Sequence, residues 1–225
     1  MKERLERLAA GLPEGTDAAL ITSGVSRRYL TGMASSAGTL VIFRSGEAYL
    51  VIDSRYIEKA RRTAQGCQVV LQRRLADQVR ELLERHGARR LAVESDYMTL
   101  SEYQNLQRQL PGVELVTDRQ LSSLLRQMRA VKAPEELEAI QRAQAVTDAA
   151  FTHILNYIRP GRTEREIAGE LLDFCYRQGS EGPSFDYIVV SGANSSMPHG
   201  VPTGKAVERG DFVTMDFGCL VDGYC

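Results

Sequence analysis

The chain has 225 residues, of which 43% are hydrophobic and 25% are charged, and its formal net charge at pH 7 is −1. This composition is typical of a globular protein with one large domain or two smaller ones. A net charge near zero, without a basic stripe, argues against nucleic acid as a partner. No apolar run reaches the roughly 20 residues of a membrane-spanning helix, and the N-terminus lacks the apolar core of a signal peptide. We therefore expect a cytoplasmic protein with no membrane partner.

The four cysteines give no sign of a metal site or a disulfide framework. They are scattered along the chain, at Cys67, Cys175, Cys219 and Cys225, and no two form a Cys-x-x-Cys pair. Both structural zinc sites and small disulfide-rich folds need closer or more regular spacing. We expect reduced thiols, as is usual in the cytoplasm.

The first half of the chain alternates short β-rich runs with helical patterns. Strands are predicted at 18–22, 39–43, 48–52, 67–71, 91–93 and 113–116, and helices at 25–30, 55–64 and 75–86. The short polar segment 44–47 between two of these strands indicates a hairpin. Alternation of this kind predicts an α/β layer domain with a mixed sheet. We expect this domain to end within the segment 121–133.

Beyond that segment the pattern changes to two long helices. Pro134 suits the first position of a helix. Apolar residues then recur at spacings of three and four, which predicts a single buried stripe. The stripe consists of Ile140, Ala143, Val146, Ala150, Ile154 and Ile158. Pro160 and Gly161 end this helix, Thr163 and Glu166 form a capping-box pattern that begins the next, and strands are predicted at 187–190 and 212–217.

Asp216 is a candidate metal ligand because it lies in the otherwise apolar run 212–217. If this strand is buried, an ionised carboxylate there is costly unless a cation or several donors compensate, and hard cations prefer carboxylate oxygens. The alternative is an aspartate at a strand end that is hydrogen-bonded to the turn at Gly218. Asp-Phe-Gly at 216–218 also occurs in protein kinases, but no His-Arg-Asp catalytic loop or Gly-rich phosphate loop precedes it.

His199 is a candidate catalytic residue because it lies in a loop rich in Gly, Ser, Asn and Pro. A neutral imidazole can donate a proton to, or accept one from, a reacting group near pH 7. The alternative is a solvent-facing loop histidine with no role. The other two histidines are better explained structurally: His86 by a predicted helix end, and His153 as a packed or surface residue of the long helix.

Eight short segments, taken in order along the chain, carry a family resemblance. They are 28–32, 53–56, 129–136, 160–164, 184–186, 191–194, 198–200 and 210–218. Together they resemble the pita-bread metallopeptidases, in particular their Xaa-Pro aminopeptidase and Xaa-Pro dipeptidase (prolidase) branch. The resemblance implies an α/β (α+β) protein. A creatinase-like N-terminal domain with a mixed sheet would occupy 1–125, and the first half of a pita-bread catalytic domain would occupy 126–225.

The resemblance also implies a function. Members of this branch are metal-dependent peptidases that remove the N-terminal residue from Xaa-Pro peptides or dipeptides, using two divalent metal ions (Mn, Co or Zn). It assigns His199 as the substrate-contacting catalytic histidine and Asp216 as the first of five metal ligands. It implies a proline-containing peptide as substrate and a homodimer as the assembly.

The resemblance places the remaining metal ligands of the family after Cys225. The first of them would be an aspartate shortly after Gly223-Tyr224-Cys225. We therefore expect the 225-residue chain to hold the metals weakly and to have little peptidase activity. A Ser-Asp pair directly after Cys225 in the parent gene would favour the metallopeptidase.

Two other functions remain open. A metal-free, creatinase-like amidinohydrolase would share the N-terminal domain and the histidine loop but would lack the metal-binding carboxylates, so Asp216 argues against it. A non-catalytic peptide-binding module on the same fold would need neither His199 nor Asp216. Peptide binding that does not depend on metal would favour the module.

Overall fold

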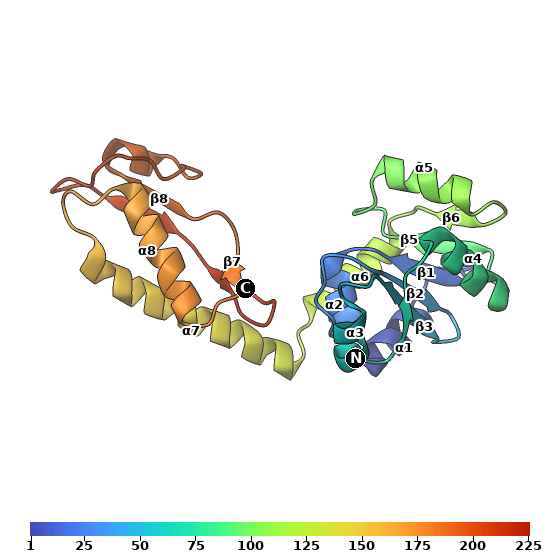
Figure 1. The fold of residues 1–225 in the computed structure, drawn as a ribbon. Helices are drawn as coiled ribbons and strands as arrows, with labels where there is room; N and C mark the ends of the chain where they lie inside the picture. Colours follow the sequence, from blue (N-terminus) through green and yellow to red (C-terminus); the bar gives the residue numbers. More distant parts are fainter. The chain divides into compact units, whose positions relative to one another are not determined.

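The computed structural model describes residues 1–225, which divide into two compact units, Met1–Val131 and Lys132–Cys225 (Figure 1). Each unit has a hydrophobic core of its own. The limit expected at 125/126 falls inside helix α6 (Gln120–Ala130). This helix belongs to the first unit because Leu121, Leu125 and Met128 pack into that unit's core.

The first unit is built around one six-stranded mixed sheet. Its strands are β1 (Ala18–Ile21), β2 (Thr39–Phe43), β3 (Ala48–Ile52), β4 (Gln68–Leu71), β5 (Arg90–Val93) and β6 (Glu114–Val116). They lie in the order β4-β3-β2-β1-β5-β6, and β2 is the one strand antiparallel to its neighbours. The mixed sheet predicted from the alternating pattern is confirmed.

Helices cover both faces of this sheet. They are α1 (Lys2–Ala10), α2 (Gly24–Thr31), α3 (Ile57–Thr63), α4 (Leu75–Arg85), α5 (Leu100–Gln109) and α6. Successive residues of a strand point to opposite faces. In β1, Ala19 and Ile21 accordingly pack with α1, α2, α3 and α6, whereas Ala18 and Leu20 pack with α4 and α5. Both faces of the central strands are therefore buried, which explains why these strands are apolar at every position.

The second unit contains the two predicted long helices, the first expected from the apolar stripe and the second from the capping-box pattern. Its elements are α7 (Pro134–Tyr157), α8 (Glu164–Arg177), β7 (Gly182–Pro183), β8 (Ile188–Ser191), η1 (Gly192–Ser196), β9 (Val213–Asp216) and β10 (Cys219–Leu220). Figure 1 shows α7 and α8 packed side by side, and their shared core includes Ala150, Ile154 and Leu171. The predicted capping box is present: the Thr163 hydroxyl accepts from the Glu166 amide at 3.2 Å, and the Glu166 carboxylate accepts from the Thr163 amide at 2.8 Å.

Three helices of the first unit, α1, α5 and α6, were not predicted from the sequence. Helix α5 begins with a capping box that the sequence does contain, since the Thr99 hydroxyl accepts from the Glu102 amide at 3.2 Å. None of the helices in the structure combines the length and the apolar character that crossing a bilayer requires.

Candidate functional site

Strands β8 and β9 form an antiparallel pair whose two faces have different surroundings. Residues paired directly across two strands lie on the same face, and the register pairs Ile188 with Asp216 and Val190 with Thr214. The opposite face carries Val189, Val213 and Met215, which pack with α7 and α8. Asp216 therefore lies on the face that points away from the two helices.

The loop that carries His199 passes over this same face. Gly200 lies so close to the sheet that an added Cβ atom would be 2.7 Å from Cγ1 of Val190. Val190 is fully buried as a result, although it is not part of the helix-facing core. The loop and the carboxyl end of β9 thus come together through packing rather than through sequence proximity.

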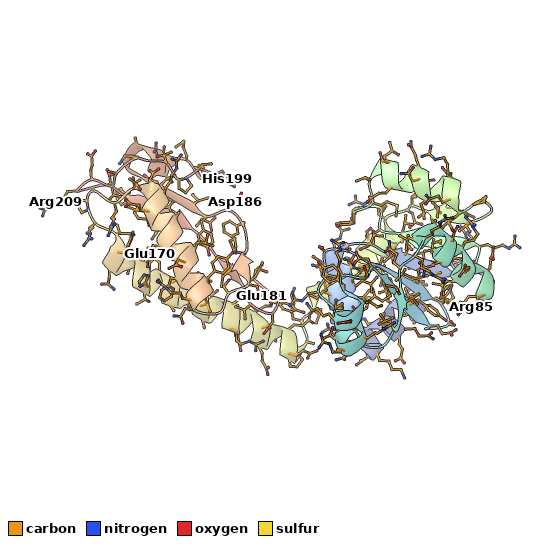
Figure 2. The ribbon with its side chains drawn as sticks, in the orientation of Figure 1. Arg85, Glu170, Glu181, Asp186, His199 and Arg209 are labelled. Carbon is orange, nitrogen blue, oxygen red and sulfur yellow. The ribbon has the colours of Figure 1, made fainter.

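A cavity of about 680 Å³ lies on this face and is lined by both predicted site residues, His199 and Asp216. Asp186, in the segment before β8, also lines the cavity. Figure 2 shows the side chains of Asp186 and His199 on the same side of the unit. The structure therefore brings His199 and Asp216 to one cavity and adds a second carboxylate that the sequence analysis did not assign.

Asp216 is exposed, so the condition under which its charge would be costly, a buried strand, is not met. Phe212, at the start of the predicted strand, is 85% exposed. The reason is that β9 packs against the helices through one face only, so half of its residues face away from the core. The cost of burying a charge therefore gives no reason to place a cation at Asp216. The prediction that Asp216 is a metal ligand then rests on the cavity and on the family resemblance.

The three polar side chains of the cavity are available to a ligand. The side chains of Asp186, His199 and Asp216 make no hydrogen bond or ion pair within the chain. Carboxylate oxygens are ligands that hard divalent cations accept. A catalytic metal site needs about three protein ligands, and no group of three or more His, Cys, Asp or Glu side chains in this chain is arranged to hold a metal ion. Asp216 fits such a site as one ligand, and these residues do not complete it.

Glu164, the first residue of α8, holds the segments on both sides of His199. Its side chain is fully buried and accepts hydrogen bonds from Ser191, Asn194 and Thr203. Burial alone would raise the pKa of Glu164, but the hydrogen bonds, of which those from Thr203 are the largest contributors, outweigh burial and lower the pKa to about 2. Glu164 is therefore ionised at neutral pH although no solvent reaches it.

Lys205 connects the end of this loop to the start of β9. Its ammonium group donates to the Asp211 carboxylate at 2.6 Å and to the Ser191 hydroxyl at 3.2 Å. The hydrogen bond between Lys205 and Asp211 raises the pKa of Lys205 and lowers the pKa of Asp211. Both groups are charged at neutral pH, and the pair joins the histidine loop to the strand that carries Asp216.

The sequence analysis did not identify Glu164 or Asp186 as site residues. Glu164 directly follows the helix cap Thr163, where an acidic residue is ordinary because it favours the helix dipole. Its hydrogen-bond donors lie 27 to 39 residues later in the chain. No local pattern signals such contacts. For Asp186, the sequence showed only that it belongs to 184–186, one of the segments that carry the family resemblance.

The sequence matches two known families along nearly its whole length. Residues 4–131 match the creatinase/prolidase N-terminal domain, and residues 138–225 match metallopeptidase family M24. The chain belongs to the creatinase/prolidase group of M24 metallopeptidases. The resemblance noted from short segments is thereby confirmed, and so is the fold class.

Individual relatives of this M24 chain carry peptidase names. It is 36% identical to "Uncharacterized peptidase YqhT" of Bacillus subtilis over 99% of this chain and 62% of that protein. It is 30% identical to the Xaa-Pro dipeptidase of Pyrococcus furiosus over 100% of this chain and 62% of that protein. The solved structure of the Xaa-Pro dipeptidase from Bacillus anthracis is similar with a TM-score of 0.92 and 37% identity, covering 99% of this chain and 62% of that one. The M24 chain thus spans about 62% of the length of these relatives.

Proposed function

We propose that this chain is part of a metallo-exopeptidase that removes the N-terminal residue from Xaa-Pro peptides or dipeptides. The observation that carries the proposal is the single cavity lined by His199 and Asp216 on the open face of the β8–β9 pair. The Xaa-Pro dipeptidase names of relatives from Pyrococcus and Bacillus support the choice of substrate.

In this proposal each residue has a separate role. His199 contacts the substrate and donates a hydrogen bond to the carbonyl oxygen as that oxygen becomes negative, which is the kind of contact that stabilises an acyl-transfer transition state. Asp216 holds a divalent metal ion through its carboxylate. Divalent ions such as Mn²⁺, when bound, polarise the scissile carbonyl and lower the pKa of a water molecule.

A chimera provides a test of these roles. Residues 1–225 would replace the matching 62% of the Bacillus anthracis Xaa-Pro dipeptidase, and proline release from Ala-Pro would be measured with and without Mn²⁺. We expect release that depends on Mn²⁺. His199→Ala and Asp216→Asn should each lower kcat/KM by on the order of 100-fold or more, because the first removes a contact made in the transition state and the second removes a ligand of the metal ion.

The matched control is Glu170→Gln, which removes a carboxylate from α8 outside the cavity and should leave kcat/KM within about twofold of the parent. A folded chimera that releases no proline in Mn²⁺ would contradict the proposal. Release that does not require metal would contradict the metal-binding role of Asp216. Metal-independent peptide binding without release would favour the binding module.

A further inference from the structure

We infer that Glu164 is the positioning residue of this site, holding the loop that carries His199 in place from both sides. The inference rests on the proposed role of His199 as the substrate-contacting histidine. Glu164 itself does not line the cavity and would act through the loop.

The two oxygens of the carboxylate serve different segments. Oε1 accepts from the amide and hydroxyl of Ser191, at 2.7 and 3.1 Å, and from the side-chain amide of Asn194 at 3.2 Å. Oε2 accepts from the amide and hydroxyl of Thr203, at 2.9 and 2.6 Å. One carboxylate therefore joins the chain that precedes His199 to the chain that follows it.

The backbone around Glu164 reinforces this connection. The Glu164 amide donates to the carbonyl of Lys205, and the Arg165 amide donates to the carbonyl of Thr203, both at 3.1 Å. Helix α8 is in turn fixed to the core of the unit through Ile167 and Leu171, which are fully buried. The core therefore fixes α8, and the first turn of α8 fixes the loop through these hydrogen bonds.

Only a carboxylate satisfies all of these partners. Each of the five groups that reach Glu164 is a donor. An amide side chain at this position would present one oxygen and one NH₂ group, so either the Ser191 side or the Thr203 side would face a donor instead of an acceptor. A buried donor without an acceptor is unfavourable, and we expect the loop to detach on that side.

The experiment uses the 225-residue chain with Glu164→Gln, and Glu170→Gln as its matched control. Amide hydrogen exchange and the imidazole NMR signals are measured on each variant. The chain has three histidines, so His86 and His153 serve as internal references for His199. Glu170 is also a carboxylate of α8 (Figure 2). It accepts from His153 at 2.6 Å and from Arg177 instead of from the loop.

In Glu164→Gln we expect the amide of Ser191 or that of Thr203, whichever faces the new NH₂ group, to exchange roughly tenfold faster or more. The His199 imidazole signal should shift while those of His86 and His153 stay in place. In Glu170→Gln we expect the reverse pattern, with a shift of His153 and none of His199. A change of this kind is local to the loop, and a general weakening of the unit would not produce it.

Unchanged exchange at Ser191 and Thr203 in Glu164→Gln, or an unmoved His199 signal, would overturn the inference. If that variant unfolds the second unit, T203V decides the question, because it removes one donor to Oε2 and keeps the carboxylate. Faster exchange confined to the loop in T203V supports the inference, and equally faster exchange throughout the unit overturns it.

Titration with Ala-Pro separates this inference from the proposed function. If Ala-Pro leaves the His199 signal of the folded, Mn²⁺-loaded chimera unchanged, substrate contact by His199 fails, while the exchange result for Glu164 stands. If Ala-Pro shifts His199 in the chimera but Glu164→Gln leaves loop exchange unchanged, the positioning role fails and the proposed function stands.

Discussion

Two carboxylates of the second unit show how surroundings decide what a residue does. Glu164 is fully buried and accepts hydrogen bonds from three residues. Asp216 is exposed and has no side-chain partner within the chain. The first is fully engaged in holding the structure, whereas the second is free to accept a ligand. The burial of the two residues is the opposite of what the local sequence indicates, because Asp216 lies in an apolar run and Glu164 lies at a polar helix start.

Low pH should destabilise the second unit because the Glu164 carboxylate becomes protonated. Its pKa in the folded chain, about 2, lies below the ordinary value of 4.5. A lowered pKa stabilises the folded state fully above pH 4.5, and this contribution is lost as the pH falls toward 2. Between about pH 5 and about pH 2.5 the loss from this one group should be about 2 kcal/mol.

The measurement is urea unfolding of the second unit at both pH values, followed through its own amide signals. The unsubstituted chain should lose about 2 kcal/mol more than Glu164→Gln, since the other carboxylates titrate in both. Equal losses in the two chains would show that the carboxylate of Glu164 is not responsible.

At the scale of elements, the site depends on a loop lying flat on a strand pair. The β8–β9 pair uses one face for the core and the other for the cavity, and Gly200 allows the loop to approach Val190 closely. Val190 is a stiff, β-branched residue that is fully buried, so it has little freedom to move aside. The position of His199 therefore depends on the absence of a side chain at the next residue.

Gly200→Ala should lift the histidine loop from the sheet. The new Cβ atom would lie 2.7 Å from Cγ1 of Val190, and overpacking of this kind costs about 1 to 3 kcal/mol. We expect a lower urea midpoint for the second unit and faster amide exchange in the loop. The double variant Gly200→Ala with Val190→Ala should recover part of the loop's protection, because the clash is removed.

Gly204→Ala is the control for this prediction. Gly204 belongs to the same loop, but an added Cβ atom there meets no atom within 4 Å. It should change the free energy of unfolding by less than about 0.5 kcal/mol. Similar effects at both glycines would mean that flexibility of the loop, and not contact with Val190, is what the substitution alters.

At the scale of the whole chain, the second unit carries eight of the thirteen large apolar side chains that are exposed. Large apolar side chains that are at least 43% exposed in this unit are Leu137, Phe151, Leu155, Tyr176, Phe185, Met197, Val201 and Phe212. The β8–β9 pair also has no further strand on either side. Open strand edges and exposed apolar patches both favour association with another chain.

We expect the chain to self-associate, with a dimer as the smallest assembly. Phe151 and Leu155 lie four residues apart on α7 and so share one face of the helix. Leu155→Glu should shift the distribution toward monomer in sedimentation velocity runs over a range of concentrations, because it places a charge on that face. Leu100→Glu is the control, since Leu100 is 71% exposed on α5 of the first unit. A monodisperse monomer at every concentration would contradict the prediction.

Much of the secondary structure follows from local patterns in the sequence. The six strands of the first unit and the helices α7 and α8 were predicted from runs of apolar residues, from their spacing and from caps such as Thr163. These signals depend on residues a few positions apart, and so they can be read directly. Helices α1, α5 and α6 were not predicted, although Thr99 and Glu102 supplied a cap for α5 that could have been recognised.

For the candidate site, too, some features could be predicted from the sequence and others only from the tertiary structure. The sequence alone identified His199 and Asp216 as residues with suitable chemistry, and their roles stay predictions. Only the tertiary structure decided that they line one cavity, that Asp216 is exposed, and that Glu164 holds the loop between them. Burial and hydrogen bonding depend on segments that folding brings together from 27 to 39 residues away. No pattern of neighbouring residues carries that information, because it is set by how the helices, the strand pair and the loop pack.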